Sequence, residues 1–400
     1  MTIASPVVVV VVGAGAAGLA CALTLVRAGV PVRVFEAGER VGGRIATDAV
    51  HGFRCDRGFQ VLVDSYPEAR ALLDYRALRL GRFRPGALVR WRGRFHRLAD
   101  PRRAPLAALA ALGSPLAGWR NGLAALRLAR DGLSGGSALD AVRAAGFTPD
   151  LIDAFFRPWF GGIFLDRALG VAAERAGVVV ARFASGAAAL PAGGMEAIPL
   201  QLAAGLPAGT VALGRAVRAL RADGVTMADG EEVAARAVVV AVAPPALARL
   251  VPGFSAPPFL TVRAVHLAAP APLPFDGRWL VLDGEGSGPA TTLACPSAVA
   301  QGYAPPGQHL LSASVLGDGE DDPAAGVLAQ CRAWFGPVVD GWRHLATQRI
   351  AYAQHRQHPG DPTTPPRVAG LYLAGDHTTE ASLDGALRSG RLAAEAILAG

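Results

Sequence analysis

The chain has 400 residues, of which 52% are hydrophobic and 18% are charged, and its formal net charge is +7. A chain of this length and apolar content exceeds one small domain and is not disordered, so the composition predicts a globular protein of two domains. The basic residues are all arginine, because the sequence contains no lysine. We interpret this as a compositional bias and expect no nucleic-acid partner.

The sequence lacks the signals of several other classes of protein. A charge-free run of membrane-spanning length, Ala197–Gly214, is broken by Pro199 and Pro207, and no basic region precedes the N-terminal valines as in a signal peptide. We therefore expect a cytoplasmic protein, free or bound peripherally to a membrane. There is no G-x-S-x-G motif and no metal-ligand spacing, so neither a hydrolase nor a metal site is predicted. The cysteines are scattered and predicted to be free thiols: Cys21, Cys55, Cys295 and Cys331.

The N-terminal stretch predicts a dinucleotide site. The valines of Val7–Val12 are typical of a buried parallel strand, and a buried helix is expected over Ala16–Ala28. A second strand, Val32–Phe35, ends at Glu36, whose carboxylate is placed to accept from ribose hydroxyls. The G-x-G-x-x-G turn and these elements predict a Rossmann-like α/β fold, with cofactor contacts at Gly13, Gly15, Ala16, Ala17, Gly18, Glu36 and Ala37.

The following segment ERVGGR, residues 39–44, resembles the second glycine motif of the flavin amine oxidase and phytoene desaturase superfamily. The resemblance implies bound FAD, with Gly42, Gly43 and Arg44 against its pyrophosphate. It also implies that Gly58 and Phe59 lie beside the flavin ring. Phe59 stands where monoamine oxidases have a second glycine, which argues against an amine oxidase. Val217 matches the position whose backbone contacts the adenine.

The C-terminal stretch 370–400 carries the second strong motif. A short strand, Leu371–Ala374, is predicted before Gly375-Asp376, and a helix over Gly385–Leu398. The resemblance implies that Gly375, Asp376, Leu383 and Ala386 contact FAD, Asp376 at the ribityl chain and Leu383 through its backbone N–H. No cysteine is present in this motif, so the expected FAD is not covalently bound.

The middle of the chain is predicted to form the substrate domain. Helical patterns dominate from Tyr66 to about Gly186, and Pro244–Pro274, with eight prolines, is expected to be a crossing segment. Alternation predicts an antiparallel sheet, one wall of a substrate cavity, from segments around His266–Ala268, Trp279–Leu282, Thr291–Cys295 and Leu310–Val315. Val233–Val242 is expected to be one strand. We predict a discontinuous FAD domain of residues 1–70, 187–250 and 366–400, and a mixed α+β substrate domain of residues 71–186 and 251–365.

Aromatic residues concentrate in Asp153–Arg167. They fit either core packing or the lining of an apolar substrate tunnel. The predicted substrate contacts are Phe155, Phe156, Trp159 and Phe160. The ten arginines of Arg76–Arg103 fit a solvated basic face, or attraction to an anionic membrane or acidic substrate.

The resemblance implies hydride transfer from an apolar small-molecule substrate to flavin N5. Monoamine and polyamine oxidases use a lysine near N5, which this sequence cannot supply, so a dehydrogenase or desaturase is favoured. The alternatives are a flavin amine oxidase, a flavin-dependent isomerase and a non-catalytic lipid-binding protein of the GDP-dissociation-inhibitor type. Arg57, Trp159 and Tyr352 are the candidate catalytic residues, and structural roles fit them equally. The sequence does not determine the oligomeric state or the electron acceptor.

Overall fold

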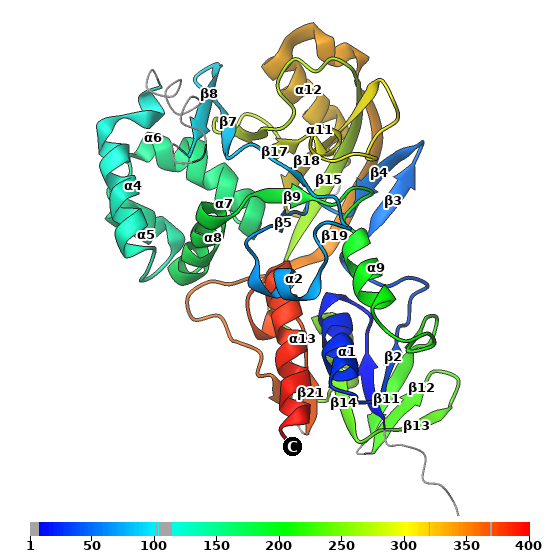
Figure 1. Cartoon of the computed structure of the whole chain (residues 1–400). Helices are drawn as coiled ribbons and strands as arrows, with labels where there is room; N and C mark the ends of the chain where they lie inside the picture. Colours follow the sequence, from blue (N-terminus) through cyan, green and yellow to red (C-terminus); the bar gives the residue numbers. More distant parts are fainter. Residues whose placement is uncertain (1–7, 101–102, 104–113, 222, 320, 369) are drawn as a thin grey trace, which may run out of the picture.

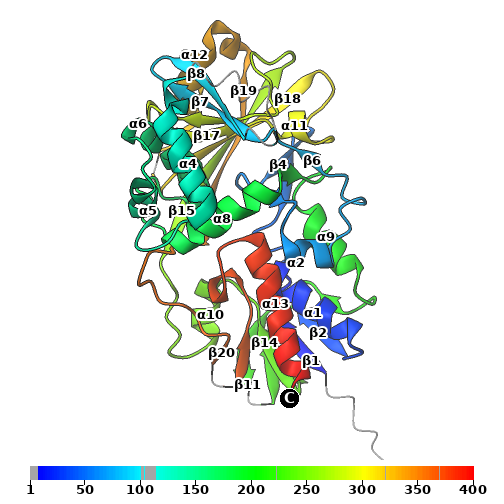
Figure 2. The ribbon, with the colours of Figure 1, turned by 60° about the vertical axis from the view of Figure 1, so that its left-hand side comes forward.

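The computed structural model describes residues 8–100, 103, 114–221, 223–319, 321–368 and 370–400. Two large sheets occupy opposite ends of an elongated molecule (Figures 1 and 2). Among the described residues, none of the helices is both long enough and apolar enough to cross a membrane.

The first sheet is six-stranded, and its strands come from both ends and the middle of the chain. Its order is β10 (Val211–Ala212), β2 (Val32–Phe35), β1 (Val9–Val12), β14 (Ala237–Val240), β21 (Leu371–Leu373) and β20 (Arg367–Val368). All neighbours pair in parallel except β20, which is antiparallel to β21. The valines of β1 are buried on both faces, as the N-terminal sequence predicts for a central strand.

Helices cover one face of this sheet and a small antiparallel sheet covers the other. On the helical face lie α1 (Ala16–Arg27), α13 (Leu383–Leu398) and α9 (Ala197–Ala204), with α2 (Pro67–Leu72) against α13. The other face packs against α10 (Pro244–Leu250) and against β11 (Val217–Arg221), β12 (Gly224–Met227) and β13 (Glu232–Ala234).

The single strand expected over Val233–Val242 is wrong. The chain forms β13 beside β12, bends at Ala235 and Arg236, and then forms β14 beside β1. The reason is tertiary pairing, because Ala237–Val240 pair with β1 of the parallel sheet whereas Glu232–Ala234 pair with β12 of the small antiparallel sheet.

The second sheet is seven-stranded and mostly antiparallel. Its order is β19 (Arg343–His355), β15 (Phe259–Pro270), β18 (Gln308–Leu316), β17 (Ala290–Ala294), β16 (Leu280–Asp283), β7 (Gly86–Trp91) and β8 (Arg94–Ala99). The crossing segment expected over Pro244–Pro274 is therefore incomplete, since α10 and β15 lie within it. Strand β15 fills the interval that is free of proline before Pro270. The β7–β8 hairpin likewise interrupts the region expected to be helical.

Helices cover both faces of the second sheet. One face carries α4 (Trp119–Asp131), α5 (Ala138–Ala144), α6 (Pro149–Leu151), α7 (Arg157–Phe164) and α8 (Ala173–Ser185), with a π-helical turn at Ile152–Phe156. The other face carries α12 (Ala324–Phe335), and the short α11 (Pro296–Val299) lies beside β18. We call the segment from α4 to α8 the helical segment. A helical pattern at Pro105–Leu112, within the region expected to be helical, lies outside the described residues.

Short strands connect the two sheets. They are the hairpin β3 (Thr47–Val50) and β4 (Phe53–Asp56), and the three-stranded sheet β5 (Leu62–Val63), β9 (Ala188–Leu190) and β6 (Gly81–Arg82). The strands of the six-stranded sheet all lie within residues 1–70, 187–250 and 366–400. The exact boundaries of the two domains stay a prediction.

Candidate cofactor site

The turn after β1 is shaped by glycines at which side chains do not fit. The Gly13 N–H donates to the carbonyl of Phe35 at 2.8 Å, which fixes the turn beside the end of β2. A Cβ on Gly18 would lie 2.0 Å from the carbonyl oxygen of Gly13, so only glycine allows α1 to approach the strand this closely.

The start of α1 is open. A Cβ added to Gly15 would meet no atom within 4 Å, and Gly15 provides no side-chain cap for the helix. Ala16 and Ala17 are the first helical residues, and their N–H groups precede the first intrahelical hydrogen bonds. An uncapped helix start beside open space is suited to a phosphate group.

Glu36 ties together the loops that follow the first two strands. One carboxylate oxygen accepts from the Ala14 N–H and the other from the Gly38 N–H, each at 2.8 Å. Ala37 is exposed beside it. The structure therefore gives Glu36 a role in fixing the glycine turn, and its predicted contact with ribose stays a prediction.

The second glycine motif lies directly against the first. The Gly42 N–H donates to the Ala14 carbonyl at 2.8 Å, and Gly15 pairs with Gly42 in a parallel bridge. A Cβ on Gly43 would lie 3.6 Å from the Cα of Gly15. The two motifs thus form one backbone surface at the end of β1.

Arg44 joins this surface to the C-terminal motif. Its Nη2 donates to Asp376 Oδ1 at 2.5 Å, and its Nη1 donates to the Ala353 carbonyl at 3.0 Å. Burial acts to raise the pKa of the Asp376 carboxyl, but the Arg44 guanidinium outweighs it and the pKa is lowered. Asp376 is therefore a buried carboxylate anion, which accepts hydrogen bonds and does not donate them.

Two histidines beside this ion pair lack partners. Both ring nitrogens of His377 and Nδ1 of His355 are buried without a hydrogen bond, and His377 is only 4% exposed. Burial lowers the pKa of His377 to about 4, so its ring is neutral, with one N–H donor and one acceptor. Leaving such groups unpaired costs about 1–3 kcal/mol each, so a polar ligand at this position fits the residues present. Sequence reasoning missed both histidines, although His377 directly follows the Gly-Asp pair.

The start of α13 completes this end of the site. Ser382 caps the helix by accepting from the Gly385 N–H at 2.9 Å, and the Ala386 N–H donates to the Ser382 carbonyl at 3.0 Å. Leu383 is the first helical residue, two residues before the predicted start at Gly385, and its N–H precedes the intrahelical bonds. The Gly375 N–H donates to Ser389 Oγ at 2.9 Å, which holds the Gly-Asp turn against α13.

The other predicted cofactor contacts lie in varied surroundings. Gly58 lies against β19, since a Cβ there would be 3.8 Å from Ile350 Cδ1. Phe59 packs edge-to-face on Phe83 with ring centroids 5.9 Å apart. Val217 begins β11 and packs against the sheet face that carries α10. No cofactor contact of these three residues is tested by the structure.

The predicted substrate residues form one aromatic layer. Phe156 and Phe160 are buried, whereas Phe155 and Trp159 are half-buried. Trp159 stacks on Phe160 and Phe155 with ring centroids 4.8 and 5.2 Å apart. This layer belongs to the core between the helical segment and the second sheet, and the tunnel stays a prediction.

The three predicted catalytic residues are not joined by any described hydrogen bond or ring contact. Arg57 is exposed and donates from Nε to Asp48 Oδ2 at 2.9 Å. Tyr352 is also exposed and packs edge-on against Phe259. Trp159 makes ring contacts with the other members of the aromatic layer and with Phe183, and it packs against the core of the helical segment.

A polar row on the second sheet was not predicted from the sequence. His266 and Ser312 are register partners on β15 and β18, and Thr292 lies on the neighbouring β17. His266 Nδ1, Ser312 Oγ and Thr292 Oγ1 are buried without partners. His266 Nε2 lies 3.2 Å from Gln348 Oε1, an acceptor, so the free Nδ1 is the acceptor nitrogen. Strand alternation alone does not reveal such a row, because the residues come from three strands.

The glycine surface, the uncapped helix start and the partly buried Arg44–Asp376 pair together define a dinucleotide-binding flavoprotein site. A family model described as flavin containing amine oxidoreductase matches residues 16–398. The chain belongs to this family. It is an enzyme, a flavin-dependent oxidoreductase, and the family description gives a flavin as its cofactor. That this flavin is FAD, held without a covalent link, stays the prediction made from the sequence.

The chain is similar over short stretches to two enzymes and over nearly its whole length to a solved structure. Residues in one stretch are 44% identical over 71 positions to protoporphyrinogen oxidase 2 of Arabidopsis thaliana, covering 18% of this chain and 14% of that protein. The match to putrescine oxidase of Kocuria rosea is 46% over 82 residues, or 20% of this chain and 17% of that protein. An oxidoreductase from Methanosarcina mazei has a similar structure, with a TM-score of 0.79, 19% identity and coverage of 98% of this chain and 100% of that one.

Proposed function

We propose that the enzyme removes a hydride from an apolar substrate in a dehydrogenation or desaturation. The observation that carries the proposal is the aromatic layer, in which Phe155 and Trp159 remain half-buried on the helical side of the second sheet. FAD supplies the hydride acceptor, its N5 atom, and passes the electrons to a second acceptor when bound. The chain's own contribution is to position the substrate carbon and to exclude water.

The polar row adds hydrogen-bonding atoms to the proposed substrate site, which is otherwise apolar. His266 Nδ1 offers an acceptor, and the hydroxyls of Ser312 and Thr292 offer donors or acceptors. Since buried polar atoms favour partners, a mainly apolar substrate that carries a few hydrogen-bonding groups suits this surface better than a pure hydrocarbon.

Amine oxidation is the competing function, and the match to putrescine oxidase favours it locally. Against it stands the absence of lysine from the sequence. Isomerisation of an apolar substrate also fits the site, because it uses the same contacts. The non-catalytic lipid-binding alternative is no longer needed, since the family is one of oxidoreductases.

The test is to mix the enzyme with each candidate substrate without oxygen and to measure reduction of the bound flavin by its absorbance. We expect carotenoid or porphyrinogen substrates to bleach the flavin and monoamines and putrescine to leave it oxidised. Bleaching by amines alone would overturn the proposal. Conversion of an apolar substrate to an isomer without net bleaching would support the isomerase instead.

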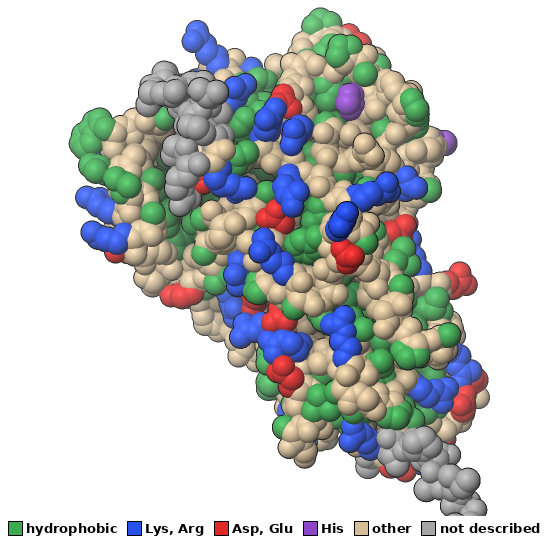
Figure 3. All heavy atoms as spheres, in the orientation of Figure 1, with side chains coloured by type: hydrophobic (Ala, Val, Ile, Leu, Met, Phe, Trp, Pro, Cys, Tyr) green, Lys and Arg blue, Asp and Glu red, His purple; other side chains and the backbone are tan. Residues whose placement is uncertain are grey.

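We further propose that the enzyme meets an anionic membrane surface through the exposed face of α4. Trp119, Leu123 and Leu126 lie one turn apart on this helix and are 73%, 46% and 67% exposed. Arg120 and Arg127 flank them on the same helix. Hydrophobic and basic side chains indeed adjoin along the edge of the molecule where α4 lies (Figures 1 and 3). A helix of this kind rests at the boundary between headgroups and acyl chains.

The apolar stretch Leu106–Leu116, which follows the ten arginines in the sequence, adds no support to this membrane proposal. Residues 106–113 lie outside the described residues. Leu116 is buried, with 1% of its surface exposed, because it packs into the core beside Ala124 of α4.

A further inference from the structure

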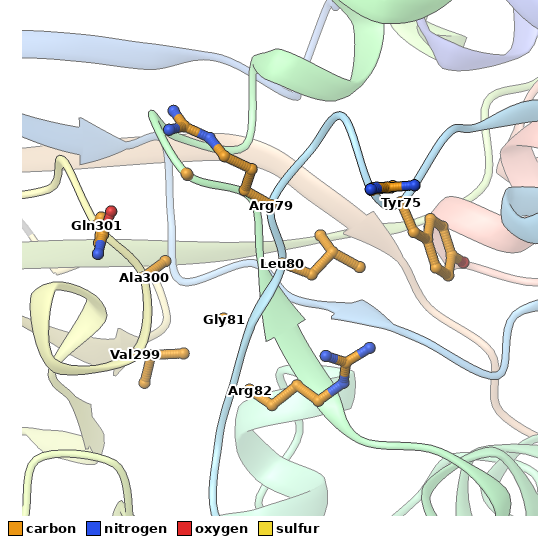
Figure 4. Close-up of a pocket in the computed structure, with 10 residues that line it drawn as sticks. Tyr75, Arg79, Leu80, Gly81, Arg82, Val299, Ala300 and Gln301 are labelled. Carbon is orange, nitrogen blue, oxygen red and sulfur yellow. The ribbon is translucent and has the colours of Figure 1, made fainter.

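A pocket of about 620 Å³ opens between the segment Tyr75–Arg82 and the turn Val299–Gln301 (Figure 4). Its remaining wall is Ala192. None of its lining residues belongs to the glycine surface, the Arg44–Asp376 pair, the aromatic layer or the polar row. The pocket is therefore separate from the site described above.

The charge of the pocket is strongly positive. Arg76, Arg79 and Arg82 line it, and no acidic residue does. Arg82 donates from Nε to Asp64 Oδ2 at 2.7 Å. In the part of the chain that the structure describes, neither Arg76 nor Arg79 forms an ion pair. Because Asp64 pairs with Arg82, the positive charges of Arg76 and Arg79 are the two in this pocket that lack an ion-pair partner among the described residues.

The backbone that carries these arginines is held in place. The Ala192 N–H donates to the Leu78 carbonyl at 3.0 Å, and the Asp74 N–H donates to Gln201 Oε1 at 2.9 Å. At Gly81 the two walls touch, since a Cβ there would lie 1.8 Å from the Val299 carbonyl oxygen. A fixed backbone lowers the ordering cost of binding a small ligand.

We propose that this pocket binds the phosphate group of a ligand. A phosphate monoester carries a charge of about −1.5 to −2 at neutral pH, which matches the two unpaired arginines better than a single carboxylate does. Guanidinium groups bind phosphate oxygens through paired N–H donors, and three arginines line this pocket. The ligand is either a free small-molecule phosphate or the headgroup of a phospholipid.

The test is to titrate the FAD-loaded enzyme with inorganic phosphate and to measure binding by isothermal titration calorimetry. We expect one site per chain in the wild type, and binding at least about tenfold weaker in the double variant R76S/R79S. The matched control R143S/R249S removes the same charge at two exposed arginines outside the pocket. We expect its affinity to stay within about twofold of the wild type.

Two results would overturn the proposal. One is equal weakening in the two double variants, which would mean that overall charge alone attracts phosphate. The other is the lack of saturable binding by wild-type enzyme. The flavin absorbance spectrum of each variant verifies that its fold and cofactor are intact. Because no substrate is turned over, failure of the proposed reaction leaves this test unaffected.

Vesicles distinguish the two sources of the phosphate. If vesicles containing phosphatidic acid displace inorganic phosphate from the wild type, and vesicles of phosphatidylcholine alone do not, the ligand is a phospholipid headgroup. If phosphate binds with the expected variant pattern and neither vesicle displaces it, the ligand is a free phosphate compound.

Discussion

Asp56 shows how a single buried carboxylate links distant segments. At the end of β4 it accepts hydrogen bonds from Thr47 Oγ1 at 2.5 Å, the Met195 N–H at 2.9 Å and the Tyr303 hydroxyl at 2.7 Å. Burial raises its pKa to about 6, although these hydrogen bonds oppose the shift. The residue therefore serves the packing between the connecting strands and the second sheet.

This raised pKa predicts a pH-dependent stability. Between about pH 4 and pH 6 the folded protein keeps the Asp56 proton that the unfolded chain loses, so the free energy of unfolding falls as pH rises. We expect Asp56→Asn to remove this contribution, on the order of 2–3 kcal/mol across the window. Urea unfolding at pH 4.5 and pH 7.5 measures it. The free energy of unfolding of the variant, relative to that of the wild type, should be higher at pH 7.5 than at pH 4.5. An equal difference at both pH values would contradict the raised pKa of Asp56.

Glu36 yields a prediction about the cofactor. Replacement by alanine leaves the N–H groups of Ala14 and Gly38 without their acceptor and loosens the glycine turn. We expect FAD to bind more weakly by about 1–3 kcal/mol, or roughly 5- to 150-fold. Fluorescence titration of the apoprotein with FAD measures the change. Glu39→Ala, at an exposed carboxylate in the same loop, is the control and should bind FAD like the wild type.

The predictable residues of the site are those that belong to local motifs. The glycines, Glu36 and Arg44 follow one another within a short stretch, where spacing carries the information. His355 and the polar row depend on pairing between distant strands, and His377 lies in a short 3-10 turn, Asp376–Thr378, so their burial is visible only after folding. The same limit applies to the phosphate pocket, whose walls come from three separate segments.

At the level of elements, the contact between α1 and α13 determines how tightly the two cofactor motifs meet. A Cβ on Gly390 of α13 would lie 2.1 Å from the Ala17 carbonyl oxygen and 2.9 Å from the Cys21 nitrogen. The two helix backbones are therefore in direct contact, as the small residues of the C-terminal helix predict.

We expect Gly390→Ala to force the helices apart and to destabilise the protein by about 1–3 kcal/mol. Because α1 begins at the glycine turn, FAD retention should fall as well. The matched control is Gly122→Ala in α4, where a Cβ meets nothing within 4 Å. That variant should be stabilised by up to about 1 kcal/mol, because alanine favours a helix over glycine. Thermal unfolding of both variants measures the effect. Similar melting temperatures for the two variants would contradict the close contact between α1 and α13.

Element types were predictable where one local pattern dominates, as in β2, whose bounds match the expected strand Val32–Phe35. The prediction was wrong where one apolar run serves two sheets, as at β13 and β14. It was incomplete at β15, where alternation predicts a strand only around His266–Ala268 and the proline-rich composition concealed the rest of Phe259–Pro270. In each case tertiary pairing, rather than local propensity, determines the boundary.

At the level of the whole molecule, the exposed face of α4 predicts vesicle binding. Wild-type enzyme should sediment with anionic vesicles at low salt, and less so at high salt because the arginine attraction is screened. The double variant W119S/L126S should bind at least about tenfold more weakly, since it removes the largest exposed apolar groups. Leu200→Ser, at an exposed leucine of α9, is the control and should bind normally. Unchanged binding of the double variant would exclude this face.

The ion pair between Arg44 and Asp376 has a consequence for biosynthesis. The two residues are 332 positions apart, so a ribosome that adds about 5–20 residues per second finishes the second one roughly 17–66 s after the first. During that time the nascent chain has β1 and α1 but lacks β21 and α13, and the apolar surface that α13 covers stays open to solvent. The cofactor site is therefore complete only after Asp376 has been synthesised, and the surface of α1 that packs on α13 is covered only at the end of synthesis.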